Sequence, residues 1–551
     1  MKDGIGSKTI RDRIKMVLFM SGVALSFLLG LLIRYQLAPI FTGNSYVEPA
    51  FLQRQEGVSV TLARGRIMDR NEIPLHSPCW NPAVAVFPTQ VTVKEDFAKE
   101  AALATGLTET WLESVLDTSA LPSKILRNIP AARAKDIVSA NIPGLAVIPE
   151  EIRYGPFSLA RHVVGHIRPN AYMNPKDNIG ESGLERWFQS ELAGGTPAWA
   201  GTLVTGEGQE LPGAGVRIGS IRDYPKDLVT TIDVSIQYTV ETILDEELIE
   251  KGAVVVLDSK TGEILAMASR PQYDQNRPED YLNCAEAPFV NRAISDFTPG
   301  SVWKPVIIAL ALERGYIQPS ELFVCEGSIQ VGPATVKCGH SENGHGSVTA
   351  KEAIAKSCNS ALIQIGLRIP PEELVEWAQT CGFGQETEVP LPDELRGLLP
   401  APYSMLPGDV ANYSIGQGYL TVTPLQMAAF YRSMINGGKL GDPTLIPGPH
   451  ANEKAICSTQ TCRLLQEALV LATQKGGTGE AAWVPGLGSA GKTGTAEVDG
   501  TSSHSHAWFV GWSPVMVPEY VICVFAERAG SGPALAAPIF RKIAAQLLLC
   551  Q

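Results

Sequence analysis

The sequence predicts an α+β fold that follows a single membrane-spanning helix. Three observations support this prediction: an uncharged apolar run near the N-terminus, strand patterns near residues 252–268 and 507–526, and a long helical stretch between those strands. Helices and antiparallel strands that occupy separate stretches of a chain are typical of α+β proteins. The 551 residues suffice for about three or four domains with large buried cores.

The apolar run spans Met16–Ile33 and contains no charge. A helix of this length just crosses a hydrocarbon core of about 30 Å. Basic residues outnumber acidic ones before the run, which predicts a cytoplasmic tail over residues 1–15, a transmembrane anchor over residues 16–34 and an extracytoplasmic remainder. The alternative is a cleaved signal peptide. We favour the anchor because the run is longer than usual for such a peptide and no small-residue cleavage site follows it.

The remaining chain divides into two predicted domains, over residues 35–230 and 231–551. Their predicted elements are strand-like valines at 84–93, helices over 96–117 and 132–140, a strand over 228–232, a helix over 234–251, strands over 252–258 and 263–268, strands over 507–511 and 520–526, and a closing helix over 539–549. The net charge of −12, with no basic cluster after the first fifteen residues, argues against nucleic acid as a partner.

The first chemical motif is Ser301-Val302-Trp303-Lys304, at the start of an apolar helix. Residues three apart on a helix share a face, so the lysine amine can take the proton of the serine hydroxyl and activate it as a nucleophile. The helix N-terminus also favours negative charge that develops there. Alone, however, S-x-x-K is common by chance.

Two further motifs follow. Ser357-Cys358-Asn359 is an S-x-N triplet, which alone could be a helix cap, since serine and asparagine favour caps. Lys492-Thr493-Gly494-Thr495 precedes an apolar strand, and Gly494 would let a ligand approach the backbone closely; alone, this motif could be a plain turn. The order S-x-x-K, S-x-N, K-T-G is typical of the penicillin-recognising serine enzymes. The spacings, 56 residues from Ser301 to Ser357 and 135 from Ser357 to Lys492, leave room for a helical lobe.

The chain resembles the class B penicillin-binding proteins, the monofunctional peptidoglycan D,D-transpeptidases, over nearly all of its length after the anchor. The boxes that carry the resemblance, besides the three motifs, are Arg64–Asn71, His162–Gly165, Gly180–Glu185, Thr231–Asp233 with Gln237, Ser414–Gly418 and Thr423–Met427. Glu72 and His76 depart from it, where the family usually has glycine and often has alanine. The resemblance implies a pedestal domain of the dimerisation type over residues 35–230. It implies a transpeptidase domain over residues 231–551, with an antiparallel sheet, flanking helices and a helical lobe.

The resemblance also implies roles for single residues. Ser301 would attack the D-Ala–D-Ala carbonyl, Lys304 would act as base, Ser357 would relay a proton to the leaving amine, and Asn359 would orient the pair. Lys492, which is placed with the catalytic groups, and the substrate-binding residues Thr493, Gly494 and Thr495 suit the terminal carboxylate. The backbone N–H groups of Ser301 and Thr495 would form the oxyanion hole. No cofactor is required for this chemistry.

A cysteine and histidine cluster lies between the first two motifs: Cys325, Cys338, His345 and Cys358, with His340 in reserve. Three thiolates and an imidazole make a closed structural zinc site, and some class B enzymes of the elongation type carry metal ligands in the matching region. The spacings of 12, 6 and 12 intervening residues are irregular. A Cys325–Cys338 disulfide and unrelated buried thiols therefore remain alternatives.

The expected function is thus the cross-linking of peptidoglycan stem peptides by a serine acyl-enzyme that β-lactams inhibit. A D,D-carboxypeptidase, a β-lactamase-like hydrolase and a non-catalytic cell-wall scaffold are the alternatives. The expected partners are stem peptides, lipid-linked precursor glycans, β-lactams, the cytoplasmic membrane and a membrane glycosyltransferase of an elongation or division complex. The sequence does not choose between elongation, division and sporulation.

Overall fold

The chain folds into two compact units, which a computed structural model describes over residues 4–41, 55–62, 64–119, 121–169, 178–194, 198–203, 216–219, 225–339, 343–448, 453–498 and 501–549. One unit comprises Met1–Leu62, Trp80–Ile152 and Thr196–Arg222. The other comprises Ala63–Cys79, Arg153–Gly195 and Asp223–Gln551. The segments Ala63–Cys79 and Arg153–Gly195 therefore belong to the same compact unit as the three motifs.

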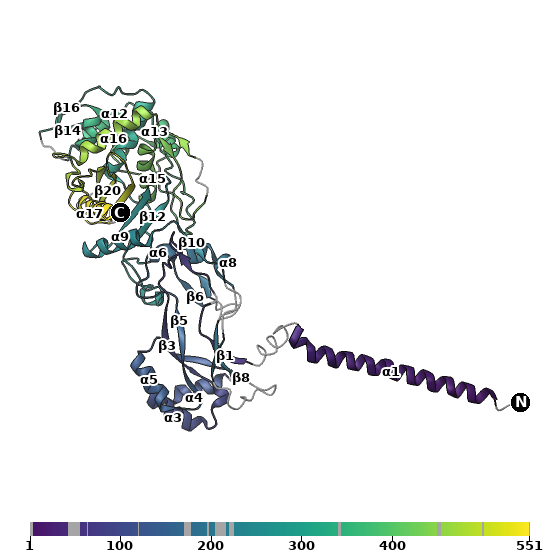
Figure 1. The fold of residues 1–551 in the computed structure, drawn as a ribbon. Helices are drawn as coiled ribbons and strands as arrows, with labels where there is room; N and C mark the ends of the chain where they lie inside the picture. The colour runs from purple at the N-terminus through teal and green to yellow at the C-terminus, as the bar shows by residue number, and fades with distance from the viewer. Residues whose placement is uncertain are drawn as a thin grey trace. The chain divides into compact units, whose positions relative to one another are not determined.

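Helix α1 (Gly4–Phe41) contains the predicted anchor (Figure 1). Its segment Arg11–Arg34, 24 residues of mean hydropathy 2.5, is the one helix among the described residues that is long and apolar enough to cross a membrane. A helix suits this role because it satisfies its own backbone hydrogen bonds in lipid.

Besides α1, the described residues of the first unit form two small sheets and three α-helices. One sheet has the order β1 (Gln55–Ser59), β8 (Trp199–Leu203), β9 (Arg217–Gly219); the other has the order β4 (Ser123–Leu126), β3 (Cys79–Val86), β5 (Leu145–Ile152). The helices are α3 (Lys94–Thr105), α4 (Glu109–Thr118) and α5 (Ala131–Ala140). Phe97, Leu112 and Leu116 bury the apolar faces of α3 and α4 against Val86 of β3.

Two predictions for this unit are wrong. The single helix expected over residues 96–117 is two helices, because Gly106 adopts φ 70°, a left-handed conformation that ends α3. The strand expected as far as Val93 ends at Val86, because Pro88–Gln90 form a 3₁₀ turn (η2). Proline at the start of that turn fixes φ and supplies no N–H for a strand ladder.

The N-terminal part of the second unit is organised around a buried carboxylate. Its short elements are β2 (Ile67–Met68), α6 (Arg161–Val164), β6 (Ile167–Pro169), β7 (Asn178–Gly180), α7 (Gly183–Trp187), α8 (Gln189–Leu192) and β10 (Leu228–Val229). Glu185 of α7 is fully buried and accepts hydrogen bonds from Arg64 Nε and Arg153 Nε at 2.5 Å each. Burial alone would raise the pKa of Glu185, but the two guanidinium groups hold it below its usual value.

The ion pair between Arg64 and Glu185 joins two of the boxes that carry the family resemblance. The two residues are 121 positions apart in the sequence. The departure at Glu72 has a backbone consequence: Glu72 adopts φ 63°, the left-handed region where glycine is favoured. The strand expected over residues 228–232 is limited to the two residues of β10, which pairs with β2 in parallel.

A five-stranded antiparallel sheet forms the centre of the second unit. Its order is β12 (Ile264–Arg270), β11 (Gly252–Asp258), β21 (Tyr520–Ala526), β20 (Thr501–Ser513), β19 (Ala490–Val498). The predicted hairpin around Asp258–Gly262 is confirmed, with Val254 opposite Ala268. Because strand side chains alternate, Val254 and Val256 face one core while Ala253, Val255 and Leu257 face another.

Helices cover both faces of this sheet (Figure 1). On one face lie α9 (Val234–Glu246) and α17 (Ala536–Leu549), and on the other lie α15 (Pro424–Ile435) and α16 (Thr459–Thr473). Helix α9 ends before the predicted residue 251 because Leu248 adopts φ 53° and Gly252 begins β11. The closing helix is confirmed and starts three residues earlier than expected.

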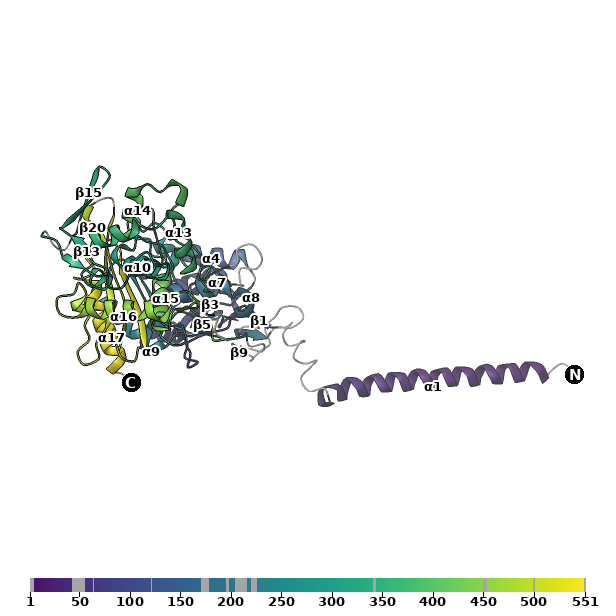
Figure 2. The same cartoon turned by 90° about the horizontal axis from the view of Figure 1, so that it is seen from above.

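Four further helices pack against one another and form a helical lobe next to the sheet (Figure 2). It is built from α10 (Lys304–Glu313), α12 (Asn359–Gly366), α13 (Pro371–Thr380) and α14 (Pro407–Ser414), with the short α11 (Ala350–Ala355) between the lobe and α16. Short strand pairs accompany these helices: β13 (Phe323–Cys325) with β16 (Gly346–Val348), β14 (Ser328–Val331) with β15 (Ala334–Lys337), and β17 (Lys439–Leu440) with β18 (Lys454–Ala455).

Candidate active site

Lys304 is the group on which the first two motifs converge. Its side chain is fully buried at the start of α10, and its Nζ donates to the carbonyl oxygen of Ser357 at 2.7 Å, to Ser357 Oγ at 3.2 Å and to Asn359 Oδ1 at 2.7 Å. Ser357 adopts φ 54°, a strained conformation for a non-glycine residue. The turn thereby presents both oxygens of Ser357 to the lysine. The structure thus joins S-x-x-K to S-x-N.

Ser301 lies one turn before Lys304, in the 3₁₀ turn η4 (Gly300–Trp303) that leads into α10. Gly300 adopts φ 59°, and its N–H donates to the carbonyl oxygen of Gly416 at 2.9 Å. A Cβ on Gly300 would lie 2.8 Å from the carbonyl oxygen of Thr495. The turn that carries Ser301 is therefore packed directly against the K-T-G strand. All three motifs thus lie close together, where the helical lobe meets the sheet.

The residues Lys492–Thr495 lie in the middle of β19, an edge strand of the sheet. Lys492 is fully buried, and its Nζ donates to Thr478 Oγ1 at 3.2 Å and to the carbonyl oxygen of Thr493 at 3.2 Å. Thr478 is a residue that our sequence reasoning missed. The Gly476-Gly477-Thr478-Gly479 stretch that carries it is a usable signal of a tight turn, but not of a contact with Lys492.

Both lysines are shifted towards the neutral amine. Burial lowers the pKa of Lys304 to about 8, against a smaller opposing effect of Cys338 and Cys358. Burial, together with the charge of Lys304 nearby, lowers the pKa of Lys492 well below its ordinary value. An amine with a pKa near the working pH can both accept and return a proton, which general base catalysis requires.

Acylation by penicillin should therefore rise with pH. Below a pKa of about 8 the neutral fraction of Lys304 increases about tenfold per pH unit, and above this pKa it levels off. Stopped-flow measurement of the second-order acylation rate constant between about pH 6 and pH 9.5 gives the profile. Lys351→Ala, which removes a half-exposed lysine of α11, should leave the profile unchanged. A flat or falling profile for the wild type would refute Lys304 as the base.

The cysteine and histidine cluster converges as the sequence predicted. The β13–β16 pairing sets Cys325 opposite Gly346, next to His345, and Cys338 follows β15 with its N–H bonded to the carbonyl oxygen of Gly327. Cys358 is the N-cap of α12 and belongs to the S-x-N turn. The ligand atoms of Cys325, Cys338, His345 and Cys358 all lie within 4.8 Å of one another. His340, the reserve ligand, lies outside the described residues.

Three of the separations among these four atoms are close to those of a tetrahedral zinc site. His345 Nδ1 lies 3.6 Å from Cys325 Sγ and 3.4 Å from Cys338 Sγ, and the sulfurs of Cys338 and Cys358 are 3.8 Å apart. Ordinary Zn–S and Zn–N bonds in a tetrahedron require separations of about 3.6 Å for S···N and about 3.8 Å for S···S. The hydrogen bond with Cys358 lowers the pKa of the Cys338 thiol, which favours the thiolate that a metal binds.

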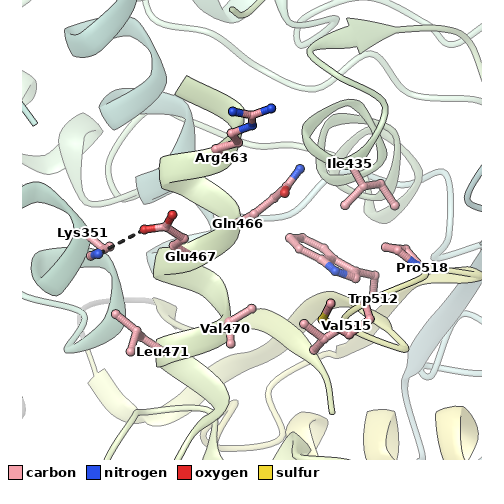
Figure 3. A pocket seen from close by; sticks show the side chains of 11 residues that line it. Lys351, Ile435, Arg463, Gln466, Glu467, Val470, Leu471, Trp512, Val515 and Pro518 are labelled. Carbon is pink, nitrogen blue, oxygen red and sulfur yellow. Dashed lines mark hydrogen bonds and ion pairs between the residues drawn. The ribbon is translucent and has the colours of Figure 1, made fainter. Parts of the chain in front are cut away.

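A cavity of about 520 Å³ lies elsewhere, among α11, α15, α16 and the β20–β21 turn (Figure 3). Apolar side chains such as Val470, Trp512 and Val515 line it, and the Lys351–Glu467 ion pair stands at its edge. Its lining contains none of the predicted site residues.

Comparison with known proteins identifies the family of this chain. Residues 252–545 match the penicillin binding protein transpeptidase domain, and residues 59–198 match the penicillin-binding protein dimerisation domain. The chain therefore belongs to the penicillin-binding protein transpeptidase family. The dimerisation domain and the names of the relatives assign it to class B within that family.

Two relatives illustrate the match. Stage V sporulation protein D of Bacillus subtilis is 30% identical over 519 residues, which cover 87% of this chain and 77% of that protein. Peptidoglycan D,D-transpeptidase MrdA of Escherichia coli is 25% identical over 570 residues, covering 89% and 87%.

Solved structures show the same fold. Penicillin-binding protein PBP2 of Helicobacter pylori, solved in complex with MreC, matches with a TM-score of 0.73 at 23% identity and covers 90% of this chain and 99% of that chain. A chain from a peptidoglycan synthase complex matches with a TM-score of 0.72 at 26% identity, covering 97% and 98%. The predicted α+β transpeptidase fold is confirmed.

Proposed function

We propose that this class B penicillin-binding protein cross-links peptidoglycan stem peptides through an acyl-enzyme on Ser301. The observation that supports this most directly is the buried amine of Lys304, one turn from Ser301 and hydrogen-bonded to Ser357 and Asn359. Among the described residues Lys304 has no ion pair, so no carboxylate holds its amine in the charged form. Transpeptidase relatives such as MrdA support the same reaction class.

In the proposed first step, Ser301 Oγ attacks the D-Ala–D-Ala carbonyl while Lys304 Nζ takes the hydroxyl proton. The tetrahedral intermediate places its oxyanion between the N–H groups of Ser301 and Thr495, whose backbones meet at Gly300. The peptide bond then breaks, and the terminal D-Ala amine leaves with a proton that passes from Lys304 through the Ser357 hydroxyl. The amine of a second stem peptide attacks the acyl carbonyl and loses a proton to Lys304. A new peptide bond forms, the ester bond to Ser301 breaks, and Lys304 returns the proton to Ser301 Oγ.

The substrate carboxylate has a matching site in the K-T-G strand. Lys492, Thr493 and Thr495 lie in β19, next to Gly494, whose missing side chain brings the strand close to Pro299 and Val302. A bound carboxylate raises the pKa of Lys492 and restores its charge, because an opposite charge favours the protonated amine. Recognition of the D-Ala terminus and protonation of Lys492 are thereby linked.

We further propose that Cys325, Cys338, His345 and Cys358 hold one structural zinc ion, which supplies no chemistry to the reaction itself. The cluster is connected to the active site: the backbone N–H of Asn359 donates to Cys338 Sγ at 3.3 Å, and Asn359 Nδ2 donates to the carbonyl oxygen of Lys337 at 3.1 Å. The ligand set therefore holds Asn359 and the Ser357 turn in position for Lys304.

Transpeptidation and carboxypeptidation use the same acyl-enzyme and differ in the acceptor, so the products separate them. Purified full-length protein, supplied with nascent glycan strands from a membrane glycosyltransferase, should release D-Ala and form cross-linked muropeptides in comparable amounts. Ser301→Ala should form neither product. D-Ala release without cross-links would assign a carboxypeptidase, rapid turnover of penicillin would assign a β-lactamase-like hydrolase, and no reaction would assign a scaffold.

The partners we propose are lipid-linked precursor glycans and a membrane glycosyltransferase that polymerises them. The structural relatives come from a peptidoglycan synthase complex and from a PBP2–MreC complex, which supports an assembly of this kind for the present chain. The domain over residues 35–230 would serve as the pedestal that such partners contact.

The proposed orientation has the tail of residues 1–15 in the cytoplasm and residues 35–551 outside. Arg11, Arg13 and Lys15 precede the uncharged run Met16–Ile33 of α1, as expected for the cytoplasmic side. Protease added to intact, wall-stripped cells should digest the bulk of the chain and spare only the anchor. Complete protection, or a mature N-terminus beyond residue 30, would contradict this orientation.

A further inference from the structure

Gly532 lies in the segment that joins β21 to α17, far in sequence from the three motifs, yet it contacts the K-T-G strand. Its backbone N–H donates to Thr495 Oγ1 at 3.2 Å. Its carbonyl oxygen accepts from the N–H of Ala537, in the first turn of α17, at 3.0 Å. The segment is also held to β20, where the N–H of Gly530 donates to the carbonyl oxygen of Ser505 at 3.1 Å. Gly532 thus connects Thr495 to the closing helix.

Space, and not backbone conformation, requires glycine at position 532. Its φ lies outside the left-handed region, so an L-residue could adopt this backbone. A Cβ, however, would lie 2.4 Å from the carbonyl oxygen of Gly494 and 2.4 Å from that of Trp508. Both obstacles are backbone atoms of the central sheet, which cannot rotate away as a side chain can. Any side chain here would move the segment away from β19 and lengthen the hydrogen bond to Thr495.

This hydrogen bond sets the direction of the Thr495 hydroxyl. A threonine hydroxyl has one proton and two lone pairs, and the N–H of Gly532 occupies one lone pair. Within the described part of the chain, no acceptor is found for the proton of Thr495 Oγ1. The hydroxyl is therefore held as an acceptor towards Gly532 and is left to donate its proton to a ligand.

We infer that Gly532 is a positioning residue for recognition of the substrate carboxylate, acting through the hydroxyl of Thr495. The inference rests on the proposed function, in which Thr495 binds that carboxylate. A positioning role of this kind predicts that changes at Gly532 affect ligands that carry the carboxylate more than ligands that lack it.

The test compares a penicillin with its methyl ester on the full-length protein in detergent, measuring the second-order acylation rate constant for both. The ratio of acid to ester should fall by roughly tenfold or more in Thr495→Val, since a hydrogen bond to a charged group is lost. Gly532→Ala should lower the ratio similarly, and adding it to Thr495→Val should change the ratio little further. Gly408→Ala is the control, because a Cβ on Gly408 meets nothing within 4 Å.

The outcomes separate this inference from the proposed function. An unchanged ratio in Thr495→Val would remove the proposed role of Thr495 itself. A normal ratio in Gly532→Ala, or an equal loss for acid and ester, would overturn the inference while Thr495→Val still supports the role of Thr495. Additive effects in the double variant would also overturn it.

A second measurement leaves Gly532 in place and is independent of whether Gly532→Ala folds. Amide hydrogen exchange, followed by mass spectrometry on peptides covering residues 528–535, should show one amide that exchanges faster in Thr495→Val than in the wild type. Thr495→Ser keeps the hydroxyl and should retain the wild-type protection. Equal exchange in all three proteins would show that the hydrogen bond does not hold Gly532.

Discussion

Replacing Ser301 by alanine is expected to abolish covalent labelling by a fluorescent penicillin. Ser301 lies one turn before the buried Lys304 and directly follows Gly300, whose Cβ position would approach the carbonyl oxygen of Thr495. Loss of the nucleophile in enzymes of this chemistry costs about four to six orders of magnitude in rate, because the remaining groups can only bind the ligand. Labelling of the variant should therefore fall below detection.

The same experiment needs a folded variant and a control. Ser301 is half-buried, and removing one oxygen from it leaves the packing of η4 and α10 intact, so the melting temperature should change little. Ser295→Ala, which alters a half-buried serine six positions earlier, should label at the wild-type rate. Peptide mapping of the labelled wild type should place the adduct on the peptide that contains Ser301. Equal labelling of Ser301→Ala would remove this residue from the nucleophile's role.

Loss of the proposed zinc ion is expected to have the second largest effect. Purified protein should contain about one zinc per chain. Cys325→Ser should lower the metal content, the melting temperature and the acylation rate together. Structural zinc contributes on the order of 10 kcal/mol in small peptides, but a domain with its own core depends on it less. A loss of about 3 kcal/mol would lower the melting temperature by roughly 4–5 °C in a domain of about 320 residues.

The effect on acylation follows from the contacts of Asn359. Its N–H donates to Cys338 Sγ, and its Oδ1 accepts from Lys304 Nζ, so a displaced Cys338 also displaces the base. A chelator should reproduce both losses in the wild type. Cys523→Ser is the matched control, because Cys523 is equally buried but lies in β21, outside the cluster.

Elemental analysis distinguishes the zinc site from the two alternatives, a Cys325–Cys338 disulfide and unrelated buried thiols. A metal content near zero, together with a Cys325–Cys338 disulfide in the peptide map, would establish the disulfide instead. A metal-free protein in which all three thiols react with an alkylating reagent after unfolding would assign them as ordinary buried cysteines.

The sequence alone was sufficient where the physical cause is local. Ser301 and Lys304 lie three positions apart where the 3₁₀ turn η4 continues into α10, so their proximity follows from local helical geometry. The continuous apolar runs of β11 and β12 on either side of Asp258–Gly262 likewise predict a hairpin that is buried on both faces, as the structure has it. The uncharged run in α1 determines a segment that can span a membrane.

Local reasoning failed where one residue overrides the pattern around it. The helical spacing over residues 96–117 continues through Gly106, yet the left-handed conformation of that glycine ends α3. Leu248 ends the pattern of α9 in the same way, although leucine gives no sign of a positive φ.

Contacts between distant segments were decided only by the tertiary structure. The pairing of β13 with β16, and of β14 with β15, brings Cys325, Cys338 and His345 to the N-cap of α12, although their spacing in the sequence is irregular. Thr478 reaches Lys492, and Gly532 reaches Thr495, through loops with no sequence motif of their own. Sequence periodicity reports which face of an element is buried, whereas the packing of whole elements determines which backbone atoms approach closely enough for glycine to be required.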